Sequence, residues 1–217
     1  MRTYHVKEIY YTLQGEGAQS GRSAVFCRFA GCNLWSGREE DRLRALCQFC
    51  DTDFVGSDGP GGGQFDDPAS LAKAVRAAAT HVNAGNTAGV PRWVVCTGGE
   101  PLLQLDPPLL DALHAEGLSV AVETNGTLPA PAGLDWICVS PKAGSEIVLR
   151  QGNELKIVVP QPGLDLDELQ TWNFQHFFLQ PMDGRDVRAN TELAVQYCLA
   201  NPVWRLSIQS HKLIGLP

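Results

Sequence analysis

The stretch WVVCTGGEP, residues 93–101, joins a short run of apolar and β-branched residues to two consecutive glycines. A near-continuous apolar run of this length is typical of a strand that is buried on both faces of a parallel sheet. Glycines directly after such a strand allow the backbone to approach a ligand closely, because they carry no side chain. The stretch therefore predicts a parallel strand whose carboxyl end lies beside a binding site.

Runs of the same kind recur along the chain and predict further strands. They cover residues 24–29, 118–123, 135–139, 154–159, 177–180 and 205–209, and an earlier run over 5–13 predicts an edge strand or hairpin. Helical periodicity appears between only some of these strands, over residues 68–84, 107–115, 164–172 and 187–200. Too little chain lies between 123 and 135, and between 142 and 154, for a crossover helix.

This pattern predicts an α/β fold of a particular kind, a partial, open (β/α) barrel of about six or seven parallel strands with missing helices. A complete eight-unit barrel takes about 250 residues, and this chain has 217. A doubly wound sheet is the alternative. We expect a single domain over residues 1–217.

The composition excludes several classes of partner. The net charge of −7 argues against nucleic acid, because phosphate binding needs a basic face. The first residues show no apolar signal-peptide core, and no apolar stretch nears the length that spans a bilayer. We therefore expect a cytoplasmic protein with neither a nucleic-acid nor a membrane partner.

Residues 56–63 are rich in glycine and predict a mobile surface loop. A phosphate-binding loop is the alternative interpretation. It is disfavoured because no Lys-Ser/Thr pair follows the glycines and no helix begins directly after them.

Three of the seven cysteines, Cys32, Cys47 and Cys50, are spaced Cys-x14-Cys-x2-Cys just after the predicted strand over 24–29. Three thiolates are enough to hold a cuboidal iron–sulfur cluster while one iron keeps an open position. Adding Cys27 gives Cys-x4-Cys-x14-Cys-x2-Cys, which is typical of a four-thiolate structural zinc site. The spacing alone leaves both interpretations open.

Strand alternation separates Cys27 from the other three cysteines. Its side chain shares a face with Val25 and Phe29, so we expect it to pack among apolar neighbours. Arg28 points to the opposite face, the predicted interior of the barrel. This alternation favours the three-thiolate cluster. The fourteen-residue insert 33–46 would then fold out and return, with one or two helical turns over 39–45.

Polar motifs follow several of the predicted strands. They are Thr-Gly-Gly-Glu-Pro at 97–101, Glu-Thr-Asn-Gly at 123–126, Ser-Pro-Lys at 140–142, Gln-Pro-Met-Asp at 180–183 and His-Lys at 211–212. Each motif alone is ordinary turn chemistry. Together they are more informative, because α/β sheets and barrels build their sites at the carboxyl ends of parallel strands.

The cysteine group, with Phe49 before its last member, and the Gly-Gly-Glu-Pro motif resemble the radical S-adenosylmethionine (SAM) superfamily. The motifs at 13–17, 50–52, 123–126 and 140–142 narrow the resemblance to the 7-carboxy-7-deazaguanine synthase family, from about Gln14 to the last residue. Most of the superfamily spaces these cysteines Cys-x3-Cys-x2-Cys, whereas some members of this synthase family resemble the chain in carrying a longer loop. A glycyl-radical activase would share the cluster but lack the features at 14–17 and 51–52. A zinc-stabilised binding protein is the alternative from another class.

The resemblance implies a carbon–nitrogen lyase of queuosine biosynthesis. The reaction would contract the ring of 6-carboxy-5,6,7,8-tetrahydropterin to 7-carboxy-7-deazaguanine with loss of ammonia. It would use a 4Fe–4S cluster, SAM and Mg²⁺, with the radical generated at the cluster and SAM and no catalytic side chain assigned with certainty. An electron donor such as flavodoxin and a homodimeric state are also implied.

The resemblance also implies a role for each matching position. Cys32, Cys47 and Cys50 would hold the cluster, and Thr52 would face Mg²⁺. The SAM-binding set would be Phe49, Cys50, Asp51, Gly99, Glu123, Ser140, Pro141, Lys142, Gln180, Pro181, Met182 and Asp183. The substrate-binding set would be Leu13, Gln14, Gly15, Glu16, Arg28, Thr97, His211 and Pro217. We expect the residues after His211 to be extended, with a reach of roughly 20 Å, and the Pro217 carboxylate to fold over the substrate.

Overall fold

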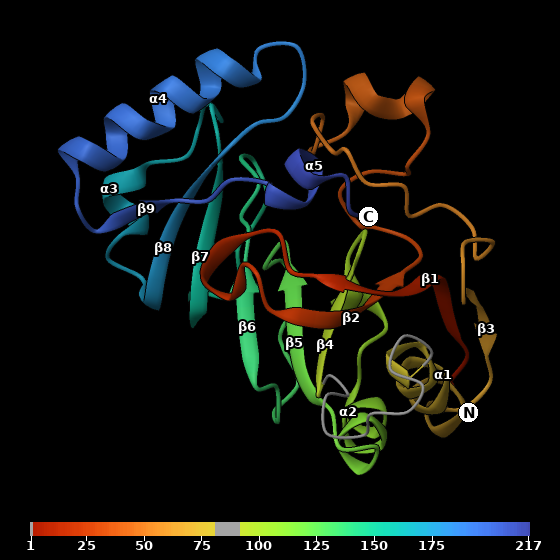
Figure 1. Cartoon of the computed structure of the whole chain (residues 1–217). Coiled ribbons are helices and arrows are strands. Elements are labelled where there is room, and N and C mark those ends of the chain that lie inside the picture. The colour runs from red at the N-terminus through yellow and green to blue at the C-terminus, as the bar shows by residue number, and fades with distance from the viewer. Residues whose placement is uncertain (1, 81–91) are drawn as a thin grey trace.

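The structure is a computed structural model that describes residues 2–80 and 92–217. Its strands form one nine-stranded sheet in the order β3-β1-β2-β4-β5-β6-β7-β8-β9 (Figure 1). The strands are β1 (Tyr4–Leu13), β2 (Ser23–Phe29), β3 (Gly63–Phe65), β4 (Trp93–Gly98), β5 (Ser119–Thr124), β6 (Trp136–Val139), β7 (Gln151–Val159), β8 (Asn173–Pro181) and β9 (Trp204–Leu206). The helices are α1 (Pro68–Thr80), α2 (Pro107–Ala115), α3 (Leu166–Leu169), α4 (Val187–Ala200) and α5 (Ser210–Ile214).

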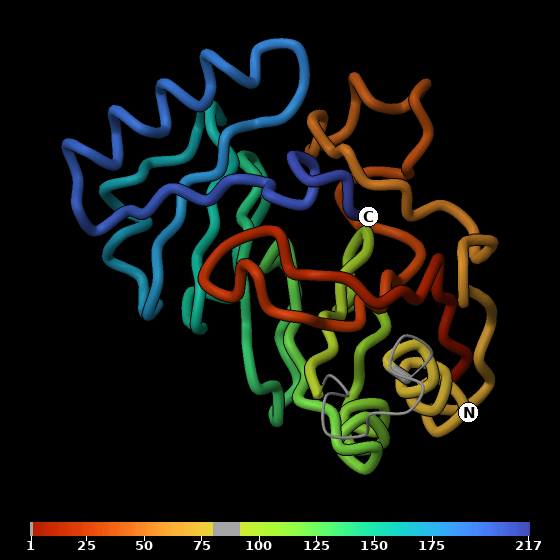
Figure 2. Tube along the Cα trace, viewed as in Figure 1, coloured from red at the N-terminus to blue at the C-terminus, as the bar shows by residue number. Residues whose placement is uncertain are grey.

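The sheet is a mostly parallel, open barrel, as the sequence predicted. Within the described residues, β2 pairs with β4, and β4 to β9 follow in chain order, all in parallel. β1 runs antiparallel to both β2 and β3. The run over 5–13 was predicted as an edge strand or a hairpin: it forms the first strand of the β1–β2 hairpin, and the short β3 lies at the edge of the sheet. Figure 2 shows the two edges, β3 and β9, on opposite sides of the molecule.

Two apolar clusters lie beneath the helices. One packs α1 and α2 against β1, β2, β4 and β5, and includes Leu71 and Val75 of α1 at 0% exposure. The other packs α3 and α4 against β7 and β8, and includes Leu179 and Ala194. The connections from β5 to β6 and from β6 to β7 contain no helix, which confirms the missing helices predicted from chain length.

Some predicted boundaries differ from the structure. The helix predicted over 68–84 extends to Thr80, and residues 81–84 lie outside the described residues. The helix predicted over 164–172 covers only Leu166–Leu169, since the chain turns at 171–172 to enter β8. The strand predicted over 205–209 ends at Leu206, where pairing with β8 ends.

Strand alternation in β2 is as predicted. Cys27 is 1% exposed in the same apolar cluster as Val25 and Phe29, and burial raises the pKa of its thiol. Arg28 points to the other face, into the cavity described below. Cys27 is therefore separated from the three cysteines of the loop that follows.

Residues 56–63 do not form the free loop that their composition predicts. The N–H of Gly59 donates to the carbonyl of Lys7 at 2.9 Å, and the N–H of Ile9 donates to the carbonyl of Pro60 at 2.7 Å. A Cβ at Gly62 would lie 2.1 Å from the Lys7 carbonyl oxygen. The glycines thus allow this segment to pack directly on the backbone of β1.

Among the described residues, none of the helices combines the length and apolar character needed to cross a bilayer.

Candidate functional site

A cavity of about 400 Å³ opens at the carboxyl ends of the parallel strands. Almost the whole set of predicted site residues lines it. They are Leu13, Gln14, Gly15, Glu16, Arg28, Cys32, Cys47, Phe49, Cys50, Asp51, Thr52, Thr97, Gly99, Glu123, Ser140, Lys142, Gln180, Pro181, Met182, Asp183, His211 and Pro217. Pro141 is the exception, because it is buried next to the cavity without lining it.

The three predicted cluster cysteines share one wall of this cavity. The insert that separates them folds out through a 3₁₀-helix, Glu39–Arg44, and returns where the N–H of Leu46 donates to the carbonyl of Leu34 at 3.2 Å. Its return places Cys47 and Cys50 on the same wall as Cys32. A hydrogen bond from Cys47 lowers the pKa of the Cys50 thiol to about 6. The long spacing in sequence is thus compatible with a compact three-thiol site.

Three thiols that line one cavity are a donor set that suits a cuboidal cluster. No group of three or more His, Cys, Asp or Glu side chains within residues 2–80 and 92–217 is close enough to hold one metal ion. A zinc ion would need its thiolates about 2.3 Å from one point, whereas a cuboidal cluster spreads its ligands over separate irons. Cys27, the fourth ligand of the zinc interpretation, lies in the apolar core.

The glycines of the Thr-Gly-Gly-Glu-Pro motif allow β4 to reach the cysteine loop. A Cβ at Gly99 would lie 2.2 Å from the Gly31 carbonyl oxygen and 2.7 Å from Cβ of Cys32. The N–H of Glu100 donates to the same Gly31 carbonyl at 2.9 Å. The backbone at Gly99 is therefore exposed to whatever the cysteines hold, as expected for a glycine at a ligand.

Glu100 joins the ends of β4 and β5, a role that the sequence analysis did not assign. Its side chain is 0% exposed and accepts from the N–H of Leu102 at 2.9 Å, the hydroxyl of Thr124 at 2.7 Å and the N–H of Asn125 at 2.8 Å. These bonds fix the Glu-Thr-Asn-Gly turn beside the cysteine loop. Asn125 in turn donates to the Asn33 side chain at 2.9 Å.

Replacing Glu100 by alanine is expected to lower the free energy of unfolding by at least about 3 kcal/mol, since three buried donors lose their acceptor. Urea unfolding followed by far-UV circular dichroism measures this change. Asp111→Ala, at an exposed position of α2, is the matched control and should change stability by less than about 0.5 kcal/mol. Equal losses in the two variants would contradict the role given to Glu100.

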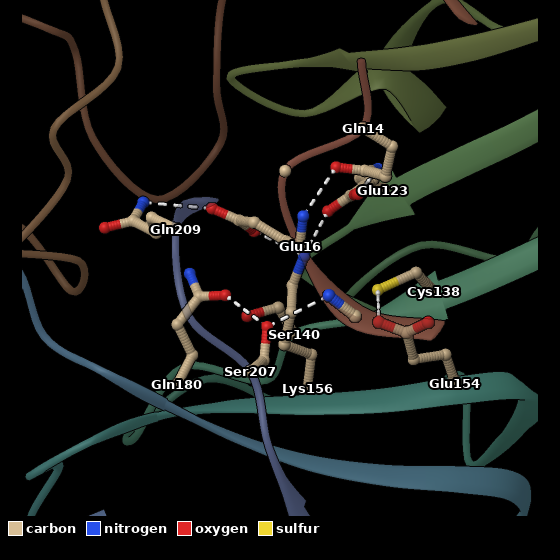
Figure 3. A network of polar contacts seen from close by, with 12 residues as sticks. Gln14, Glu16, Glu123, Cys138, Ser140, Glu154, Lys156, Gln180, Ser207 and Gln209 are labelled. Carbon is tan, nitrogen blue, oxygen red and sulfur yellow. Dashed lines mark hydrogen bonds and ion pairs between the residues drawn. The ribbon is translucent and has the colours of Figure 1, made fainter. Parts of the chain in front are cut away.

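A buried lysine organises the polar floor of the cavity (Figure 3). Lys156 of β7 is 3% exposed, and its Nζ lies 2.6 Å from Glu16 Oε2 and 2.7 Å from Glu123 Oε2. The amide of Gln14 donates to Glu123 at 2.8 Å, and the amide of Gln209 donates to Glu16 at 2.9 Å. Two amides, two carboxylates and one ammonium group therefore form a continuous hydrogen-bonded network across the floor of the cavity.

The charged groups of this hydrogen-bonded network shift one another's pKa values. Burial lowers the pKa of Lys156, but the neighbouring Cys138, Glu123, Glu16 and Glu154 together raise it well above its usual value. Burial raises the pKa of Glu16, but Lys156 and Gln209 outweigh this effect and lower it to about 2. Lys156 is thus protonated and Glu16 ionised at neutral pH.

Glu154 and Ser207 hold the loop that carries Gln14 and Glu16. Glu154, at 3% exposure, accepts from the N–H of Ala18 at 3.0 Å, and burial raises its pKa. The Ser207 hydroxyl accepts from the N–H of Gly17 at 2.9 Å and donates to the Gln180 side chain at 3.0 Å. This serine therefore connects the predicted substrate loop to the predicted SAM segment.

Arg28 is oriented by two neighbours on β1. Its Nε donates to Glu8 Oε1 at 2.7 Å, and one terminal nitrogen donates to the Tyr10 hydroxyl at 2.8 Å. Glu8 and Tyr10 also line the cavity. The remaining N–H groups of the guanidinium can reach a ligand carboxylate.

Lys142 lies on the cysteine side of the cavity. Its Nζ donates to the Ser140 carbonyl at 2.6 Å and to the Ser140 hydroxyl at 2.9 Å, and lies 5.9 Å from the centre of the Phe49 ring. Burial lowers the pKa of this lysine. The Ser-Pro-Lys and cysteine motifs therefore meet at one place.

The chain after β9 covers the mouth of the cavity. The expected extended segment is instead the short helix α5, which places His211 against the backbone of Gly15. Ser210 donates to the Gly15 carbonyl through its N–H at 3.0 Å and its hydroxyl at 2.9 Å. Pro217 lines the cavity.

Sequence reasoning missed several polar residues that line the cavity, chiefly Lys156, Gln209 and Lys212. A signal for Lys156 was present, since Glu154 and Lys156 alternate inside an otherwise apolar strand, and buried charges are rarely unpaired. The His-Lys motif marked the position of Lys212 without giving it a role, and no local pattern marked Gln209, whose partners are distant in sequence.

Comparisons with known proteins agree with this arrangement. The chain is 59% identical, over 99% of its length and 100% of the relative's, to the 7-carboxy-7-deazaguanine synthase of Caulobacter vibrioides. It is 60% identical to the synthase of the same name from Bordetella pertussis, over 99% of each chain. The crystal structure of QueE from Escherichia coli matches with a TM-score of 0.66 and 30% identity, covering 96% of this chain and 95% of that one. No family model matches the chain.

Proposed function

The chain belongs to the 7-carboxy-7-deazaguanine synthase family of radical SAM enzymes, and we propose that it converts 6-carboxy-5,6,7,8-tetrahydropterin to 7-carboxy-7-deazaguanine with loss of ammonia. The observation that carries this proposal is that three thiols and the Gln14–Glu16 loop line the same cavity. A radical formed beside the thiols can then reach a substrate held by the loop. A glycyl-radical activase would have to admit a segment of a partner protein into the cavity. Binding such a segment would not require the polar floor.

Cys32, Cys47 and Cys50 would hold a 4Fe–4S cluster, with SAM on the iron left open. The chemistry that the bound cluster and SAM supply is reductive formation of the 5′-deoxyadenosyl radical, which takes a hydrogen from the pterin ring. The surrounding residues would orient SAM. Phe49, Asp51 and Gly99 lie on the cysteine side, and the positions assigned to the rest of SAM are Glu123, Ser140, Pro141, Lys142 and Gln180–Asp183.

Thr52, which lines the cavity near the cysteines, would face Mg²⁺. This ion prefers oxygen ligands and keeps several of its waters, so one hydroxyl with oxygens of the substrate is a reasonable environment. The carboxylates of Asp51 and Asp53 also line the cavity, and each forms an ion pair with a lysine, Lys212 and Lys7 respectively.

The polar floor suits an amino-pyrimidinone ring. Glu16, which Lys156 holds ionised, and the carboxylate of Glu123 can accept from ring N–H groups, and Gln14 offers both a donor and an acceptor. Arg28, held by Glu8 and Tyr10, can donate to the substrate carboxylate. The enclosure of the pterin would be completed by Leu13, Gly15, Thr97, His211 and Pro217. Glu123 contacts Gln14 and so lies at the border between the proposed SAM and pterin sites.

The reaction itself is tested with anaerobically reconstituted protein. Reduced protein with SAM, Mg²⁺ and the carboxypterin is expected to release one ammonia for each 7-carboxy-7-deazaguanine formed. SAM cleavage that leaves the pterin intact would instead favour an activase, and tightly bound zinc with no visible chromophore would favour the zinc protein. A flavodoxin-type donor and a homodimeric state are part of the proposal, tested by substituting that donor and by sedimentation.

Replacing Gly15 by alanine is expected to raise KM for the carboxypterin by about tenfold or more. Its Cβ would lie 2.0 Å from His211 Nδ1, so α5 must move away from the cavity, and misplaced substrate contacts cost about this much or more. Initial rates against substrate concentration give KM. Gly21→Ala is the control: its φ of 84° makes it the more strained substitution in the backbone, whereas its Cβ would meet no atom within 4 Å. An unchanged KM in Gly15→Ala would contradict the placement of His211.

A further inference from the structure

One residue of α5 contacts two different walls of the cavity at once. Lys212 Nζ lies 2.5 Å from Asp51 Oδ2 and 2.5 Å from Asp183 Oδ2. Asp51 follows the last cluster cysteine directly, and Asp183 ends the segment after β8. The lysine therefore bridges the cysteine loop and the proposed SAM segment from a third part of the chain.

The helix that carries Lys212 has little else to fix it. α5 spans only Ser210–Ile214 and has no buried residue, and a helix of this length is not stable by itself in water. Its position depends on polar contacts, chiefly the bridge from Lys212, the two bonds from Ser210 to Gly15, and the bonds from Gln209 to Glu16 and, at 3.4 Å, to Asp51. These contacts reach the cysteine loop, the segment after β8 and the loop that carries Gly15 and Glu16.

We propose that Lys212 is a positioning residue that couples the SAM segment to the pterin-covering helix α5, by bridging Asp51 and Asp183. The inference rests on the proposed function, because it places SAM beside the two aspartates and the pterin beneath His211. If bound SAM orders either aspartate, it also stabilises α5 in its position over the pterin, because Lys212 joins the aspartates to this helix. Bound SAM should therefore tighten carboxypterin binding, and by linkage the pterin should tighten SAM binding by the same factor.

The bridge is partly exposed, which sets the size and the salt dependence of the effect. The side chains of Lys212, Asp51 and Asp183 are 36%, 46% and 40% exposed. Exposed ion pairs are individually weak, so we expect the coupling to fall by about three- to tenfold when both pairs are lost. Salt screens such pairs, so the coupling in the wild type should weaken as ionic strength rises.

Equilibrium binding without reductant tests the coupling in the absence of turnover. The dissociation constant of the carboxypterin is measured with and without SAM for the reconstituted wild type, Lys212→Met, Lys212→Arg and Arg188→Met. The last variant removes an exposed ion pair with Glu192 on α4 and is the control. We expect Lys212→Met to lose most of the coupling and its salt dependence, Lys212→Arg to keep most of both, and the control to behave as the wild type.

Hydrogen exchange measured by mass spectrometry tests the bridge itself in the same reconstituted protein without SAM or pterin. Lys212→Met should exchange faster than the wild type over residues 209–216, and Arg188→Met should not. Unchanged exchange in Lys212→Met, or coupling that persists in this variant with the same salt dependence, would overturn the inference. Failure of the wild type to bind the carboxypterin would instead refute the proposed function, while the exchange result would still decide the role of the bridge.

Discussion

Replacing Cys50 by alanine is expected to remove the visible chromophore of the reconstituted protein and all detectable turnover. The variant leaves only Cys32 and Cys47 as thiolate ligands, and a cuboidal cluster with an open iron needs three protein ligands. Iron and acid-labile sulfide per chain, together with the absorbance spectrum, measure the loss directly. The readout does not depend on substrate, so it tests the ligand assignment separately from the reaction.

Cys27→Ala is the matched control for this experiment. Cys27 lies in the apolar core among Val25 and Phe29, so its removal should cost about 1 kcal/mol of stability and leave the iron and sulfide content unchanged. Loss of the cluster in Cys27→Ala, or its retention in Cys50→Ala, would mean that the ligands are assigned wrongly.

Replacing Lys156 by methionine is expected to lower the free energy of unfolding by about 3–5 kcal/mol at neutral pH. The substitution keeps most of the side-chain volume but leaves Glu16 and Glu123, whose side chains are only 16% and 21% exposed, without their counter-ion. Breaking an ion pair in so largely buried a place costs about this much. Urea unfolding at several pH values measures the change. Lys73→Met, at an exposed position of α1, should cost less than about 0.5 kcal/mol.

The pH dependence identifies the cause of that loss. In the wild type, burial raises the pKa of Glu16, but Lys156 and Gln209 lower it further, to about 2, below the roughly 4.3 of an unfolded glutamate. A lowered pKa contributes stability that is present above about pH 4.3 and is lost as the pH falls toward 2. Without Lys156, burial and repulsion from Glu123 favour the protonated form, so the pKa of Glu16 should rise above its unfolded value.

In Lys156→Met, the contribution of Glu16 to stability should therefore change with pH in the opposite direction. The variant should gain stability as the pH falls from 7 to 5, and the difference from the wild type should shrink over this range. The acid limb of kcat/KM should also move to higher pH, because substrate binding needs both carboxylates ionised. A stability difference that stays constant from pH 5 to 7 would show that Lys156 acts by packing alone.

Much of the site could be predicted from the sequence because parallel strands place successive motifs on one edge. The order of the strands follows the order of the chain from β4 to β9, so motifs that end these strands had to converge. The separation of Cys27 from the cluster cysteines followed from strand alternation alone. The same local logic failed for residues 56–63, where composition does not reveal that the glycines pack against β1.

Local pattern and chain order thus predicted the open parallel barrel and the edge that carries the site, and the resemblance of the motifs to a known family indicated which three thiols would hold a cluster. The tertiary structure alone decided what holds the site together. Lys156 meets a carboxylate 140 positions away, and Lys212 meets one 161 positions away. Such pairs leave no periodic signal in the sequence, because the partners of a buried or bridging charge depend on how distant segments pack. The Cys32–Cys50 loop shows the same division: its residues indicated the cluster, and only its return path brought the thiols together.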